Sequence, residues 1–166
     1  KFGTFGIKSI QNTIISKTVS GKKLARQIDN QRFAFTVQIV TAKRSDVYGE
    51  LMAFIMKQRS GKENFTIIPP EINDARGNET NTVLVNGNHA VGDTTIAMDA
   101  HHNDNPHAFK AGDFIKFASH TKVYMVVADV QASSNASTVT IEPPLIATVA
   151  DDSVVTYDNV PFTVYL

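Results

Sequence analysis

The five histidines are the first residues in this sequence whose types and spacing could support chemistry. One short segment gathers imidazole and carboxylate groups, the usual ligands of transition metals: Asp99, His101, His102, Asp104 and His107. Their spacing fits no established metal motif, and Asn105-Pro106 inside the segment is typical of a loop. We therefore expect a solvated loop with no bound metal, and we expect His89 and His120 to be exposed.

The sequence contains no arrangement that is typical of an enzyme active site. The Gly-x-Ser-x-Gly nucleophile motif, the phosphate-binding loop and the dinucleotide-binding glycines are all absent. Carboxylates are scattered along the chain, so a glycosidase-type pair would have to form by spatial proximity alone. We expect no catalytic residues, no cofactor and no enzymatic activity. A hydrolase with a hidden pair of carboxylates is the least favoured alternative.

A local run of positive charge has two open interpretations. The run consists of Lys17, Lys22, Lys23 and Arg26. Such a cluster can face a polyanion, for example DNA inside a channel. No aromatic residues are interleaved with it, so phosphate contacts there would carry no sequence preference. The other interpretation is a solvated hairpin tip.

Composition places the chain among globular proteins. Its 166 residues, 42% of them apolar, suffice for one domain, or for one domain with a small insertion. The 16 basic and 16 acidic residues cancel, which argues against a protein devoted to attracting nucleic acid or membrane. The absence of cysteine excludes disulfides, thiolate metal sites and thiol nucleophiles. No apolar run approaches the roughly 20 residues that span a bilayer, so we expect no membrane insertion.

One segment has the pattern of an amphipathic helix, which we predict at residues 46–59. Apolar side chains recur there every three to four residues. Asp46 and Glu50 suit the positive end of the helix dipole, and Lys57 suits the negative end. Gly61 is placed to end the helix in a left-handed conformation.

Nearly all the remaining sequence has the pattern of strands. Residues 33–41 alternate apolar and polar side chains, and we expect residues 13–19 to pair with them. Residues 20–30 form either a loop at a strand tip or a long hairpin arm. After a polar hinge at residues 73–81, short strands follow at close spacing, as in a small barrel or sandwich. We predict them at Thr82–Val85, Thr94–Met98, Phe114–Phe117, Val123–Val130, Thr138–Glu142 and Val154–Tyr157.

These patterns predict a mainly β protein: a β-sandwich or barrel flanked by one α-helix, with an inserted barrel-like module. The last seven residues alternate in the same way as residues 33–41. We therefore expect the chain to leave its first domain near Gly77 and to return near Val160. The predicted domains are residues 1–76 plus 160–166, and an inserted β-module at residues 77–159.

Two stretches resemble tail proteins of long-tailed bacteriophages. The first contains Gln31-Arg32-Phe33, the helical Ala53-Phe54-Ile55, Arg59-Ser60-Gly61, Phe65 and Pro69-Pro70. The second contains Ala111-Gly112-Asp113, Tyr124-Met125-Val126 and Ile141-Glu142-Pro143-Pro144-Leu145. The order and spacing of these pieces carry the resemblance. The sequence departs from the pattern at Phe33, where Trp is frequent, and at Ser60, which separates Arg59 from Gly61.

The resemblance implies a virion structural protein of the distal-tail or baseplate-hub type. Such a protein forms a ring, expected to be six-fold, that connects the tail tube to the hub and host-recognition parts. Its expected partners are other copies of itself, the tube protein and the hub proteins, with DNA passing non-specifically through the lumen. Its expected location is the virion tail, after assembly in the host cytoplasm. The alternative is a carbohydrate- or receptor-binding β-module on a virion or cell surface, with residues 77–159 as the recognition surface.

A ring of identical subunits places specific expectations on this chain. Its interface is heterologous and closes by rotation, so neighbouring copies should cover the exposed strand edges. We expect Phe2, Phe5 and Ile7 at a subunit contact, where each buried aromatic would contribute roughly 1.5–3 kcal/mol. We expect the basic run at Lys17, Lys22, Lys23 and Arg26 to face the lumen.

Overall fold

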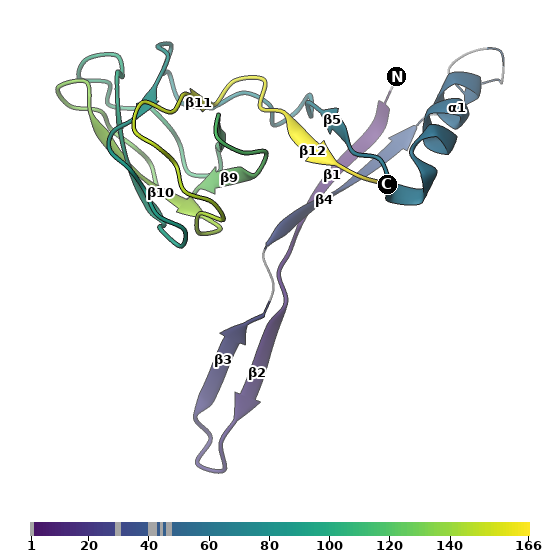
Figure 1. Ribbon diagram of the computed structural model, residues 1–166, viewed down its shortest axis with the longest axis horizontal. Helices are drawn as coiled ribbons and strands as arrows, with labels where there is room; N and C mark the ends of the chain where they lie inside the picture. The colour runs from purple at the N-terminus through teal and green to yellow at the C-terminus, as the bar shows by residue number, and fades with distance from the viewer. Residues whose placement is uncertain (1, 29–30, 40–42, 44, 46–47) are drawn as a thin grey trace. The chain divides into compact units, whose positions relative to one another are not determined.

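The computed structural model describes residues 2–28, 31–39, 43, 45 and 48–166. Contacts along the chain divide it into two compact units, Lys1–Leu51 and Met52–Leu166. The protein is mainly β with a single α-helix in its described part, which confirms the predicted fold class (Figure 1).

The first unit contains an antiparallel ribbon of β1 (Phe2–Ile10) and β4 (Arg32–Ile39). Their register places Phe5 opposite Val37 and Ile7 opposite Phe35, so apolar side chains share one face of the ribbon. The rings of Phe5 and Phe35 lie 5.6 Å apart. The alternation predicted for residues 33–41 is therefore confirmed as far as residue 39, and residues 40–41 lie outside the described part.

The predicted pairing of residues 13–19 with residues 33–41 is wrong. The N-terminal strand β1 takes that place, and β2 (Thr13–Lys17) pairs instead with β3 (Lys23–Gln27). Residues 20–28 thus belong to a hairpin arm, one of the two alternatives left open by the sequence, and residues 29–30 lie outside the described part. Gly21, at φ 81°, allows the tight turn, where its N–H donates to the Thr18 carbonyl at 2.9 Å. We refer to residues 13–28 as the arm.

The predicted helix is present as α1 (Gly49–Lys57). Residues 46–47 of the prediction lie outside the described part, and the C-terminal end is replaced by a 3₁₀ turn, Arg59–Gly61. Gly61 has φ 86°, the left-handed conformation expected of a helix stop. Phe54 of α1 packs edge-on against Phe65, with ring centroids 5.0 Å apart.

A two-stranded sheet joins the C-terminus to the segment after the helix. β5 (Phe65–Ile67) pairs antiparallel with β12 (Phe162–Val164), and Phe162 lies opposite Ile67. The chain thus returns to β5 after the residues in between have formed a separate sheet. The domain boundaries at residues 76/77 and 159/160 stay a prediction.

The intervening residues form a six-stranded antiparallel sheet that is nearly closed into a barrel. The strand order is β11-β8-β9-β10-β7-β6. The strands are β6 (Leu84–Val85), β7 (Thr95–Asp99), β8 (Phe114–Phe117), β9 (Val123–Val126), β10 (Ser137–Glu142) and β11 (Val155–Thr156). A bridge between Leu84 and Val154 joins the two outer strands, so the sheet has little free edge. All six strands were predicted from the sequence, although β9 ends four residues earlier than expected.

The barrel has a continuous apolar core. Its largest fully buried side chains include Tyr124, Phe109 and Phe117. Ile96 and Met98 alternate with outward residues along β7, as a half-buried strand requires. Among the described residues, no helix combines the length and apolar character needed to cross a membrane.

Candidate functional site

Two chain segments meet where the barrel begins and ends, and short hydrogen bonds join them. The Val160 N–H donates to the Asn73 carbonyl at 3.0 Å, and the Asn159 N–H donates to Asp74 Oδ1 at 3.0 Å. The Asn73 side chain also donates to Asn159 Oδ1 at 3.2 Å. These bonds connect residues more than 80 positions apart in the sequence. The barrel is therefore held at both of its chain connections.

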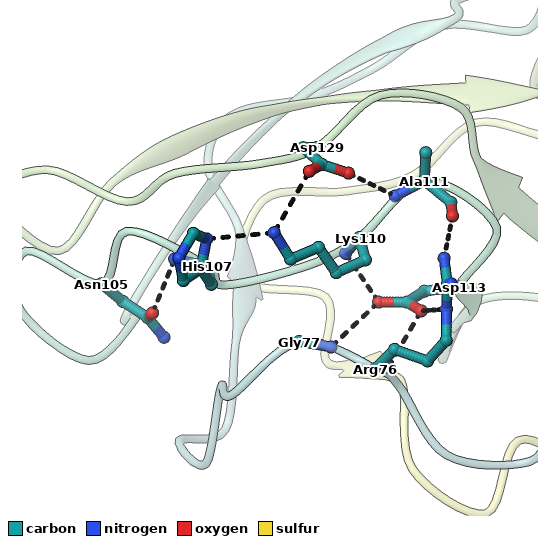
Figure 2. Close-up of polar contacts among 8 residues, drawn as sticks. All are labelled: Arg76, Gly77, Asn105, His107, Lys110, Ala111, Asp113 and Asp129. Atoms are coloured by element: carbon teal, nitrogen blue, oxygen red, sulfur yellow. Dashed lines mark hydrogen bonds and ion pairs between the residues drawn. The ribbon is translucent and has the colours of Figure 1, made fainter.

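A buried carboxylate, Asp113, fixes the first of these connections (Figure 2). Its side chain is 1% exposed. It accepts hydrogen bonds from the backbone N–H groups of Arg76 at 2.9 Å, Gly77 at 3.4 Å and Lys110 at 2.7 Å. The Arg76 guanidinium lies 3.4 Å away and balances its charge. We call these four residues the junction clamp.

The loop before β8 presents this carboxylate. Gly112 has φ 98°, a conformation that other residues rarely adopt, and Asp113 follows it directly. The Arg76 guanidinium also donates to the Ala111 carbonyl. The Ala111-Gly112-Asp113 motif therefore anchors the chain where it enters the barrel.

A second, exposed carboxylate extends the network outward. Asp129 accepts hydrogen bonds from the Ala111 N–H at 3.0 Å and from Lys110 Nζ at 3.1 Å. These two hydrogen bonds lower the pKa of Asp129 below its usual value. Lys110 Nζ also donates to His107 Nδ1 at 3.0 Å, since an ammonium group has only donors (Figure 2).

Gly77 is packed so closely that a larger residue cannot replace it without movement. A Cβ atom at this position would overlap the carbonyl oxygen of Ala108. We expect Gly77→Ala to lower the free energy of unfolding by about 1–3 kcal/mol, because backbone atoms must shift. Chemical denaturation measures this, with Gly87→Ala as a control, since no atom lies within 4 Å of a Cβ there. Gly87 has φ 82° whereas Gly77 has no positive φ, so Gly87→Ala measures the cost of backbone strain without close packing. A loss of stability at Gly77 no larger than that at Gly87 would contradict the packing argument.

A buried chain of hydrogen bonds connects two loops with the first residue of β10. Glu79 Oε2 lies 2.9 Å from His101 Nδ1, and His101 Nε2 lies 2.7 Å from Ser137 Oγ. The side chains of Glu79 and His101 are both 0% exposed. Burial by itself raises the pKa of Glu79. Hydrogen bonds from the backbone N–H groups of Asn81, His102 and Thr80 and from the His101 side chain outweigh it and lower that pKa to about 2.

This order of groups resembles that of a serine nucleophile with its histidine base and acid. With Glu79 ionised, His101 donates to it from Nδ1, and His101 Nε2 shares a hydrogen bond with the Ser137 hydroxyl. However, His101 is fully buried and packs edge-on against Phe109 at 5.7 Å. The arrangement is therefore suited to holding loops together.

The structure corrects three expectations about histidines. His101 was expected in a solvated loop but is buried, because Glu79 and Phe109 from distant parts of the sequence enclose it. His89 and His120 were expected to be exposed and are half-buried. His89 Nε2 accepts the Ala97 N–H at 3.2 Å. Burial and, to a smaller degree, the charge of Lys116 lower the pKa of His120.

The other members of the suspected metal cluster are dispersed. His107 contacts Lys110, and Asp104 accepts the Ser134 N–H at 3.0 Å. Within the described part of the chain, no three His, Asp or Glu side chains come close enough to hold a metal ion.

The structure brings the predicted basic residues together on the arm. Lys17 lies directly opposite Lys23, and Arg26 lies opposite Ile14. The N–H of Lys22 donates to Thr18 Oγ1 at 3.1 Å in the turn. All ten residues of β2 and β3 are exposed. That these basic residues face a lumen stays a prediction.

The predicted subunit contact lies on β1. Phe5 is half-buried against Phe35, Ile7 is 38% exposed, and the side chain of Phe2 lies outside the described part. Whether these residues meet another subunit also stays a prediction.

Comparison with known families decides what kind of protein this is. The family described as distal tail protein pb9, B domain, matches residues 71–160, more than half of the chain. The chain belongs to this family. The resemblance to bacteriophage tail proteins is therefore confirmed: this is a phage distal tail structural protein, and its place is the virion tail. The matched residues include the nearly closed barrel and the junction clamp. Among curated proteins, no match was found.

Sequence reasoning identified neither buried carboxylate as important. Asp113 lies in the Ala111-Gly112-Asp113 motif of the bacteriophage resemblance, which is the one signal for it in the sequence. Glu79 had none, because its partner His101 lies 22 residues away and Ser137 lies 36 residues beyond that.

Proposed function

We propose that this distal tail protein is a ring subunit whose copies complete one another's open sheets. In this proposal a ring, six-fold as in the proteins it resembles, continues the tail tube and joins it to the hub and host-recognition parts. The lumen leaves a passage for DNA. The subunits assemble in the host cytoplasm before they become part of the virion.

The contrast between closed and open sheets supports this proposal. The barrel pairs its outer strands through Leu84 and Val154. Every other sheet in the described part has only two strands. Isolated two-stranded sheets are marginally stable in water, and their free edges are templates for pairing with another chain. The two-stranded sheets outside the barrel therefore have free edges with which strands of another subunit can pair.

Exposed apolar side chains on the arm also support contact between subunits. Ile14 and Ile15 are each 55% exposed, and Leu24 is 51% exposed. Because two strands cannot bury these side chains by themselves, contact with a neighbouring subunit would stabilise the arm. An interface between different surfaces of two copies closes into a ring when the rotation between them is suitable.

The second candidate function is recognition of a carbohydrate or receptor by the barrel. The observation that favours it is the nearly closed sheet, whose outer strands are joined by the Leu84–Val154 bridge and leave little edge for a neighbour to pair with. A glycan array probed with the full chain tests this function. Both functions are compatible in one protein.

Deletion of residues 1–7 tests the ring proposal. The deletion removes Phe5, Ile7 and most of the partner strand of β4. We expect the assembly to dissociate into species of lower mass, measured by native mass spectrometry. Val91→Ser serves as the control, because this side chain is 60% exposed but belongs to the barrel segment. If the assembly keeps the same number of subunits after the deletion, the N-terminal strand is not part of the interface.

A further inference from the structure

The two compact units of the chain carry opposite charge. Residues 1–51 contain nine Lys and Arg but three Asp and Glu, a net charge of +6. Residues 52–166 contain seven Lys and Arg but thirteen Asp and Glu, a net charge of −6. The overall neutrality of the protein thus results from two strongly charged parts that cancel.

The arm carries four of these nine cations, and it contains no acidic residue to balance them. No acidic residue precedes Asp29 in the sequence. Lys17 and Lys23 lie opposite each other on one face, while Arg26 lies on the other face. Like charges directly opposite each other destabilise a strand pair. A neighbouring negative surface would relieve this repulsion.

The barrel supplies an excess of negative charge. Residues 71–160 contain twelve Asp and Glu against four Lys and Arg. Two of these four cations already pair with carboxylates, Arg76 with Asp113 and Lys110 with Asp129. The exposed acidic residues of this segment are Glu71, Asp74, Asp104, Asp129, Glu142, Asp151, Asp152 and Asp158.

We propose that the arm of one subunit docks on the acidic barrel of a second copy. This inference rests on the proposed ring, and it identifies the two surfaces that meet in it. A head-to-tail contact joins different surfaces of successive copies, which is the arrangement that segregated opposite charges favour. Contact between two arms would instead bring like charges together. DNA would also attract the arm, but an excess of opposite charge is already present on the same polypeptide.

Charge reversal on the arm tests the inference in the full chain. Lys17→Glu with Lys23→Glu reverses two exposed charges, so the fold should persist, as circular dichroism can verify. We expect the association constant, from sedimentation velocity at low ionic strength, to fall by about tenfold or more. The difference from wild type should disappear near 1 M salt, where the Debye length is about 3 Å.

The control variant changes net charge equally but leaves the arm intact. Lys62→Glu with Lys116→Glu reverses two lysines outside the arm, and we expect association at least as strong as that of wild type. If both variants associate equally, the inference is overturned. It is also overturned if the arm variant loses only affinity for duplex DNA, which would favour the lumen-facing interpretation.

Crosslinking locates the contact. A carbodiimide joins lysine amines to carboxylates, and mixing ¹⁴N- with ¹⁵N-labelled chains identifies links between copies. We expect mixed-isotope links from Lys17, Lys22 or Lys23 to acidic residues between 71 and 160. Links confined to a single copy, or to acidic residues of 1–51, would overturn the inference. If the wild-type protein forms a ring and the arm variant forms it equally well, only the contact between arm and barrel is refuted. If the wild-type protein is a monomer, the proposed ring itself is refuted.

Discussion

Asp113→Ala is expected to destabilise the barrel by about 3 kcal/mol or more. The substitution leaves three backbone N–H groups, those of Arg76, Gly77 and Lys110, without their acceptor. It also leaves the Arg76 guanidinium without its counter-charge. Since unsatisfied buried donors cost about 1–3 kcal/mol each, the effects together should exceed those of most single substitutions. Chemical denaturation followed by tyrosine fluorescence measures the change.

Asp129→Ala is the matched control for this prediction. Asp129 belongs to the same network and also accepts a backbone N–H, but its side chain is 63% exposed. Water can replace the lost carboxylate as the acceptor for the Ala111 N–H and for Lys110 Nζ, so we expect a much smaller loss of stability. Equal losses in the two variants would show that burial of the carboxylate is not what fixes the junction.

Acid should weaken the barrel as Glu79 becomes protonated. The pKa of this carboxyl is lowered from 4.5 in the unfolded chain to about 2 in the folded one. The resulting stabilisation is fully present above pH 4.5 and is lost as the pH falls toward 2. Its magnitude is about 3 kcal/mol, since one pKa unit corresponds to about 1.4 kcal/mol. Denaturation curves recorded at several pH values measure it.

Glu79→Gln isolates this contribution. The amide keeps the shape of the side chain but replaces one acceptor oxygen with a donor, among the N–H groups of Thr80, Asn81 and His102. We expect a loss of stability at pH 7 and a flatter dependence on pH between 4.5 and 2. Glu142→Gln, at an exposed position, should keep the wild-type dependence. An unchanged acid dependence in Glu79→Gln would contradict the role given to this carboxylate.

Local periodicity was sufficient to predict the helix and the barrel strands, but neither the N-terminal strand β1 nor the partner of β4. The alternation in residues 33–41 and the spacing of the barrel strands depend on neighbouring residues alone, so both could be read from the sequence. Residues 2–10 and 13–17 both have strand-forming composition, and nothing local indicates which of them pairs with β4. The predicted pairing was wrong because long-range contacts and the turn at Gly21 determine which strand pairs with β4.

The buried polar groups were beyond prediction for a similar reason. An exposed loop and a loop that surrounds a carboxylate have similar composition, so His101 appeared to be solvated. Its burial requires Glu79 on one side and Phe109 on the other. The basic run was visible because it is local, yet its concentration on one exposed hairpin emerged only from the pairing of Lys17 with Lys23.

The mass of the purified chain in solution tests the central claim most directly. The open two-stranded sheets and the segregated charge predict a closed assembly, at six times the 18.2 kDa of one chain if the ring is six-fold. Native mass spectrometry at low ionic strength, combined with electron microscopy of the particles, measures both the mass and the symmetry. A single species of 18.2 kDa at every concentration tested would contradict the claim that copies of this protein complete one another.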